Sequence, residues 1–89
     1  MKDSIGDSLM KYIVSTPDTL GGEPRIDGHR ISVRNVLGYL SCMTVDEIQE
    51  DFCLSVEEIY AALFYAKLNP KGYKRLLKRI PMALLVEEE

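Results

Sequence analysis

The spacing of apolar residues divides the chain into a strand-like first part and a helical remainder. Residues 12–16 have the β-branched and aromatic composition of a strand and stop at a proline. The paired glycines within residues 20–23 predict a loop. Residues 24–31 then surround Asp27-Gly28, a pair typical of type I′ turns, in which both central residues need a positive φ. This pattern predicts a tight β-hairpin.

The predicted hairpin would bring two positive charges together. Across a two-residue turn, Ile26 pairs with His29, and Arg25 pairs with Arg30. Like charges directly opposite one another destabilise a pair of strands. The sequence therefore predicts an acidic group beside the arginines. That group is either a carboxylate of the fold or of a dimer mate, or else a phosphate or the acid of a partner protein.

From residue 32 onward the apolar spacing is that of helices. Ser32 can cap the first of them. Thr44 with Glu47, and Ser55 with Glu58, form two capping boxes, in which the hydroxyl reaches forward to a free amide and the glutamate reaches back. These signals predict a short second helix and a longer third one.

The third helix should end at about Asn69, and a fourth should follow. Asparagine suits a cap position, and the proline after it suits the first helical turn. The fourth helix would run from about Lys71 until Pro81, with one apolar and one basic side. The basic side, called the basic stripe below, consists of Lys71, Lys74, Arg75 and Lys78.

These elements predict a mainly α fold with an N-terminal β-hairpin and a helix-turn-helix. Residues 1–11 are expected to be a flexible N-terminus. Residues 12–69 form the main domain, with the hairpin at 12–31 and three helices at 32–69. Residues 70–89 are a C-terminal basic helix and tail. The tail ends in an apolar run followed by three glutamates.

The composition is that of one small globular domain. The chain has 89 residues and a net charge of −3, too acidic overall for a generic nucleic-acid binder. It contains no apolar run near the roughly 20 residues that span a bilayer, and its first residues do not form a secretory signal. We therefore expect a cytoplasmic protein that does not contact a membrane.

Few residues have the chemistry of a catalytic or metal site. His29 is the only histidine, and no base lies near Cys42 or Cys53 in the sequence. One histidine and two scattered cysteines do not match the ligand pattern of a zinc site. The cysteines are instead expected to fill the core at helix ends. We expect no catalytic residue, no metal, no cofactor and no enzymatic activity.

The third helix is apolar almost all round, which indicates burial on more than one side. Because so small a domain buries only a modest fraction of its surface alone, we expect a homodimer. Tyr60, Phe64 and Leu68 lie at helical spacing and are the candidate contacts. The alternative is a DNA-reading helix. Glu57 and Glu58 disfavour it, because they would repel phosphates at the end that meets the bases.

The basic stripe also has two interpretations. It is either the solvated face of a packed helix or a surface for phosphates or for an acidic partner. Arg30 in the hairpin is a further candidate for DNA contact.

One run of the sequence resembles a known signature. Residues 21–33, GGEPRIDGHRISV, are similar to the signature of the domain-of-unknown-function family 433, which has Gly-Gly, a Pro, then Ile-x-Gly-x-Arg-Ile-x-Val. Further residues match in order and spacing, so the resemblance covers about residues 12–66. The chain departs from the family's usual residues at Glu23, Arg25, Asp27, His29 and Cys53.

The resemblance implies a homeodomain-like helical core and a VapB-like antitoxin role, often beside a PIN-like nuclease toxin. On this interpretation the chain neutralises such a toxin and also binds its own operator DNA. The candidate contacts with the toxin are Arg75, Arg79, Leu84 and Leu85. Two alternatives stay open: a DNA-binding transcriptional regulator without a toxin, and a structural dimeric adaptor.

Overall fold

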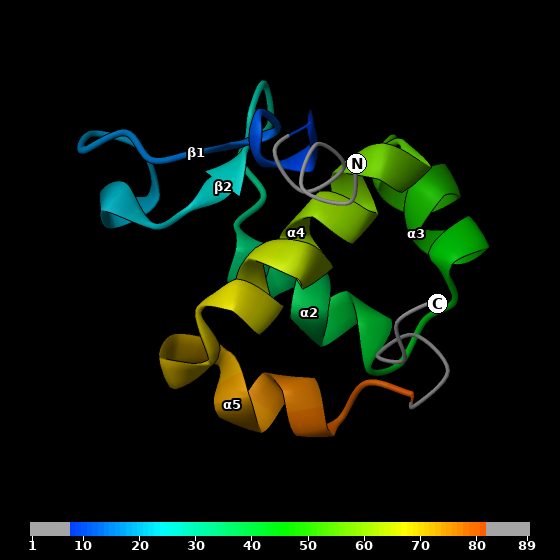
Figure 1. Ribbon diagram of the computed structural model, residues 1–89. Helices are drawn as coiled ribbons and strands as arrows, with labels where there is room; N and C mark the ends of the chain where they lie inside the picture. Colours follow the sequence, from blue (N-terminus) through cyan, green and yellow to red (C-terminus); the bar gives the residue numbers. More distant parts are fainter. Residues whose placement is uncertain (1–7, 82–89) are drawn as a thin grey trace.

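The computed structural model describes residues 8–81, and Figure 1 shows how their elements are arranged. Residues 8–10 are helical and lead toward the first strand. The following elements are β1 (Ile13–Val14), the 3-10 helix η1 (Leu20–Gly22), β2 (Arg25–Ile26), α2 (Val33–Leu40), α3 (Val45–Phe52), α4 (Val56–Leu68) and α5 (Pro70–Lys78). The protein is mainly helical with one small antiparallel sheet, as the sequence predicted.

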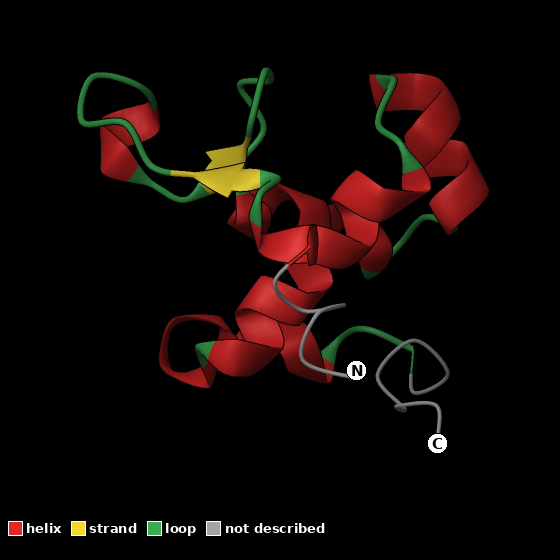
Figure 2. Ribbon diagram, turned by 45° about the horizontal axis from the view of Figure 1, so that its top comes forward, coloured by secondary structure: helices red, strands yellow, loops and turns green. Residues whose placement is uncertain are grey.

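The sheet consists of two short strands that lie on one side of the helices (Figure 2). Ile13 lies opposite Ile26, and Val14 lies opposite Arg25. The strand predicted over residues 12–16 is thus limited to its two aliphatic positions, Ile13 and Val14. Ile26 is fully buried, so this short pairing still anchors the sheet to the core.

The turn after β2 differs from the predicted type I′ turn. Gly28 has a φ of 85°, but Asp27 does not have the positive φ that this turn type also needs. The N–H of His29 donates to the carbonyl of Ile26 at 3.0 Å, and the N–H of Ile26 donates to the carbonyl of Ile31 at 2.9 Å. The predicted pairing of Ile26 with His29 is therefore wrong, because the chain closes the turn over a longer segment.

Arg25 meets neutral oxygens in place of the predicted acid. It lies opposite Ser32, so its predicted pairing with Arg30 is wrong. Its guanidinium donates to the hydroxyl of Thr16 at 2.9 Å and to the carbonyl of His29 at 3.1 Å. No carboxylate within residues 8–81 forms an ion pair with it. Once the register separates the two arginines, the repulsion that required an acid is absent.

The predicted helix starts are confirmed. Ser32 caps α2 through its side chain. At α3, the N–H of Glu47 donates to the hydroxyl of Thr44 at 3.1 Å, and the N–H of Thr44 donates to the Glu47 carboxylate at 2.9 Å. Ser55 and Glu58 repeat these two bonds at the start of α4, at 3.1 and 2.9 Å. Each box satisfies two amides that the first helical turn leaves free.

A single residue, Asn69, separates α4 from α5. Asn69 occupies the N-cap position of α5, as predicted, but its side chain makes no capping bond there. Its side-chain amide donates instead to the carbonyl of Tyr65 at 2.9 Å and closes the end of α4. Pro70 begins α5, in the position that its missing N–H suits. The helix ends at Lys78, before the predicted stop at Pro81, because the next two amides bond to carbonyls only three residues back.

The core is organised around α4, which packs against α2, α3, α5 and both strands. Five of its residues are buried: Ile59, Ala61, Ala62, Leu63 and Ala66. This confirms that the apolar third helix is buried on more than one side. The other elements contribute Ile26, Val33, Val36, Leu37, Leu40, Ile48, Leu54, Tyr73 and Ile80 to the same core.

Neither cysteine fills the core, contrary to the prediction. Cys42 and Cys53 are both exposed. Cys53 ends α3 in the left-handed conformation, with φ 57° and ψ 37°. This reverses the chain, and the following Leu54 is the residue that is buried.

The Ser55 cap should contribute measurably to stability. We expect Ser55→Ala to lower the free energy of unfolding by about 1 kcal/mol, because it leaves an amide of α4 without its partner. Chemical denaturation followed by circular dichroism measures this. Ser15→Ala, at an exposed loop serine, is the matched control and should change the value by less than about 0.5 kcal/mol. Equal effects of the two substitutions would contradict the role of the cap.

Candidate functional site

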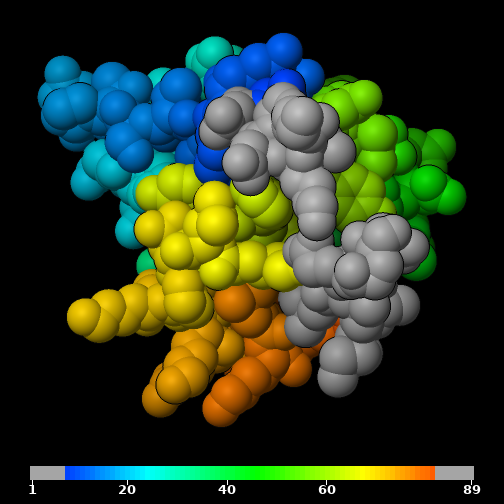
Figure 3. All heavy atoms as spheres, viewed as in Figure 1, coloured from blue at the N-terminus to red at the C-terminus, as the bar shows by residue number. Residues whose placement is uncertain are grey.

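The C-terminal helix presents a concentrated positive surface. Five basic residues, all exposed, lie on or directly after α5: Lys71, Lys74, Arg75, Lys78 and Arg79. In Figure 3 the gold and orange side chains of this segment project from the lower edge of the molecule. Within residues 8–81, no carboxylate forms an ion pair with any of them. These charges are therefore available to an acidic partner.

Buried residues on and just after α5 fix this helix to the body of the protein. Tyr73 is 5% exposed and Ile80 is 4% exposed, and both belong to the common core. α5 packs against α2 as well as α4. The basic stripe is thus carried on a packed helix and not on a separate extension.

Arg34 of α2 ties α5 to the rest of the fold. Its guanidinium carbon lies 5.0 Å from the centre of the Tyr73 ring, and its Nη1 donates to the carbonyl of Gly72 at 3.2 Å. Its Nε lies 3.7 Å from a carboxylate oxygen of Glu23, in the loop before β2. One side chain thereby connects the loop, α2 and α5.

A shallow groove lies where α4 meets α5. Tyr65 and Tyr73 meet edge to face, with their ring centres 6.1 Å apart and the ring planes at 79°. Leu68 is 58% exposed there. The groove has a volume of about 720 Å³ and is lined by Tyr65, Leu68, Asn69, Pro70, Lys71, Gly72, Tyr73 and Lys74. It therefore joins an apolar surface to the first two lysines of the basic stripe.

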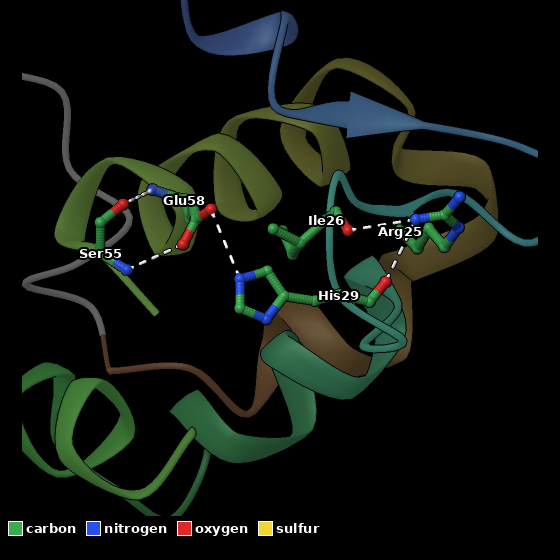
Figure 4. A network of polar contacts seen from close by, with 5 residues as sticks. All are labelled: Arg25, Ile26, His29, Ser55 and Glu58. Carbon is green, nitrogen blue, oxygen red and sulfur yellow. Dashed lines mark hydrogen bonds and ion pairs between the residues drawn. The ribbon is translucent and has the colours of Figure 1, made fainter. Parts of the chain in front are cut away.

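The single histidine is engaged by the start of α4. The Nε2 of His29 lies 3.7 Å from a carboxylate oxygen of Glu58, and both side chains are partly buried. Figure 4 shows the imidazole directed toward this carboxylate, whose other oxygen accepts the Ser55 N–H. The contact places the turn after β2 beside the start of α4.

The start of α4 is a poor surface for phosphates. Glu57 is exposed, and Glu58 faces His29. In a helix-turn-helix reader this is the end that meets the bases. The electrostatics therefore favour α5 over α4 for contact with an anion.

The other predicted site residues are dispersed. Arg30 is exposed in the turn after β2. Along α4, Tyr60 is 38% exposed and Phe64 is partly buried. Leu68 lines the groove, but Tyr60 and Phe64 do not. Leu84 and Leu85 lie outside the described residues.

Sequence reasoning missed the groove and the contacts of Arg34. The proline after Asn69 signalled a helix break, but not that the break would leave Leu68 uncovered. Arg34 had no local signal, because its contacts are with Gly72 and Tyr73, and Gly72 lies 38 residues further along the chain.

Two further findings concern the described part of the chain. No group of three or more His, Cys, Asp or Glu side chains within residues 8–81 could hold a metal ion. In the same residues, no helix has both the length and the apolar character that a membrane crossing needs.

Comparison with known protein families identifies the family of the chain. Residues 13–66 match the family described as Protein of unknown function (DUF433). The chain belongs to this family. The match runs from β1 to near the end of α4 and confirms the family resemblance seen in the sequence. The basic stripe lies beyond the matched residues. No curated protein and no solved structure matches the chain.

Tyr73 should make stability depend on alkaline pH. Burial raises its pKa above the ordinary 10.0, helped by Tyr65 and Glu23 and opposed by Arg34. A raised folded pKa stabilises the fold fully below pH 10, and this contribution is lost as the pH rises through the folded value. We expect the free energy of unfolding to fall less steeply above pH 10 in Tyr73→Phe than in the parent. Urea titrations across this range test it.

The exposed Tyr60 offers the matched control for this titration. Tyr60→Phe should keep the parent's alkaline slope. If Tyr73→Phe also keeps that slope, the buried tyrosine is not responsible for the pH dependence.

Proposed function

We propose that the protein is an antitoxin-like binding module without enzymatic activity, which neutralises a PIN-like nuclease through α5. The observation that carries the proposal is the exposed basic surface on α5, which no carboxylate of residues 8–81 neutralises. The antitoxin role that the family resemblance implies gives this surface a partner of opposite charge.

The chemistry of the two surfaces is complementary. A PIN-like site is a cluster of carboxylates that holds a metal, so a cation placed in it competes with the metal and neutralises the charge. Arg75 and Arg79 suit this task, because a guanidinium can form two parallel hydrogen bonds to one carboxylate. The neighbouring lysines would raise the rate of association, since charges at the rim of an interface steer encounter.

The proposal predicts that a gene beside this chain's own encodes a PIN-like nuclease, and the test is inhibition of that nuclease. When the two proteins are mixed in equal amounts, we expect RNA cleavage to fall at least about tenfold. This follows if the dissociation constant of the complex is far below the protein concentration, so that little free nuclease is left. Arg75→Ala with Arg79→Ala should restore most of the cleavage, and circular dichroism verifies that the variant stays folded. Lys2→Ala with Lys11→Ala changes the net charge equally and serves as control.

Two outcomes would contradict the proposal. Uninhibited cleavage in the presence of the parent protein would exclude this nuclease as the target. Equal loss of inhibition in the control pair would show that net charge, and not the surface of α5, is responsible.

Operator binding is the second candidate function, and the same stripe favours it. The side chains of Lys71, Lys74, Arg75 and Lys78 are all exposed along α5. In this case α5 supplies phosphate contacts, while the acidic start of α4 stays away from the DNA. A homeodomain-like arrangement of α3 and α4 would then act as a scaffold for α5.

The salt dependence of DNA binding tests whether the basic stripe, and not the rest of the surface, contacts the phosphates. If the protein binds duplex DNA, Lys74→Ala with Lys78→Ala should make the log–log slope of affinity against salt shallower by about 1.8 per chain. Each lost phosphate contact removes about 0.9. The Lys2 and Lys11 pair should change it much less. An unchanged slope in the stripe variant would make the stripe irrelevant to DNA binding.

A further inference from the structure

We infer that the groove between α4 and α5 receives a large apolar side chain from an acidic segment of the partner protein. This inference rests on the proposed function, because it assigns the chemistry of the partner segment that α5 binds. Its basis is the combination, in one groove, of an uncovered leucine with the lysines at the start of the basic stripe.

The groove is a consequence of the break after α4. Asn69 uses its side chain to close α4, and Pro70 starts α5 at once in a new direction. Gly72 has no side chain to fill the resulting space, and apart from its chain neighbours and the backbone of its own helix, a Cβ built there would meet no heavy atom within 4 Å. The space therefore stays open beside Leu68.

The floor and the rim of the groove have different chemistry. Tyr65, Leu68 and Tyr73 give it apolar and aromatic surface, and Leu68 leaves 58% of its area uncovered. Lys71 and Lys74 lie at the rim, and both are exposed. An occupant must therefore bury apolar atoms while it brings negative charge to the lysines.

This combination favours a protein segment over nucleic acid. Phosphates are satisfied by the exposed lysines alone and gain nothing from Leu68. An acidic segment with a leucine or phenylalanine would use both features, because the apolar side chain loses water contact as the carboxylates approach the lysines. At interfaces, a few side chains that fill well-packed pockets carry most of the binding energy.

Positive charge continues along α5 beyond the groove. Arg75 and Lys78 follow the two rim lysines on the exposed face of the helix. A segment anchored in the groove could therefore run along α5 with further acids opposite these bases. The basic stripe selects an acidic partner, and the groove selects among acidic partners.

The experiment uses two fluorescein-labelled peptides and the full chain. One peptide is a run of glutamates with a central pair of leucines, and the other has alanines in place of the leucines. Fluorescence anisotropy should show about tenfold tighter binding of the leucine peptide, the effect of burying one such side chain. The leucine peptide should shift the amide resonance of Gly72, which lines the groove, more than the alanine peptide does.

The decisive variant is Leu68→Ser. Leu68 is exposed, so this change removes the uncovered aliphatic side chain of the groove without opening the core. It should lower the affinity for the leucine peptide to that for the alanine peptide, and it should leave the affinity for the alanine peptide unchanged. Val56→Ser, at an exposed valine of the same helix outside the groove, is the matched control and should alter neither affinity.

The other outcomes each overturn the inference in a recognisable way. Equal binding of the two peptides would reject the groove but leave the basic surface, and so the proposed function, intact. Binding of neither peptide would reject both. If Leu68→Ser weakened the binding of duplex DNA as strongly as the binding of the leucine peptide, the ligand of the groove would be nucleic acid. If sedimentation showed that Leu68→Ser abolishes self-association, its occupant would be a second copy.

Discussion

The burial of α4 is the interaction on which the rest of the structure depends. This helix is apolar on nearly every side and packs against three helices and both strands. Its alanines, Ala61, Ala62 and Ala66, are fully buried, which lets neighbouring elements approach closely. A chain of 89 residues has room for only one hydrophobic core, and α4 is at its centre. The position of each other element therefore depends on which side of α4 it covers.

The position of α5 follows from that arrangement and decides where the positive charge lies. Tyr73 and Ile80 attach the helix to the core, and Arg34 attaches it to α2. A helix that is apolar on one side only must present its bases to solvent on the other. The acids are concentrated instead at the starts of α3 and α4, where the capping boxes use Glu47 and Glu58. The protein is acidic overall, yet one of its faces is strongly basic.

Local signals were reliable wherever the determining contacts lie within one turn of helix. The hydroxyl and carboxylate pairs identified the starts of α3 and α4, because a capping box closes over four consecutive residues. The signals were less reliable where two arrangements satisfy the same local rule. Asp27-Gly28 makes a turn, but the bonds of Ile26 to Ile31 and of Asp27 to Tyr12 set its register, and no local pattern predicts those. Asn69 can cap either helix, and it closes α4.

The sequence by itself determined the mainly helical fold, the family, the helix starts and the basic stripe of α5, because each depends on residue type at fixed spacing. The tertiary structure alone decided which surfaces of these helices stay open. It placed Arg34 on Tyr73, directed His29 to Glu58, and left Leu68 uncovered beside Lys71 and Lys74. The contacts of Arg34 and His29 join residues far apart in the chain. They exist only because packing around α4 brings separate elements together, and spacing along a sequence carries no record of that.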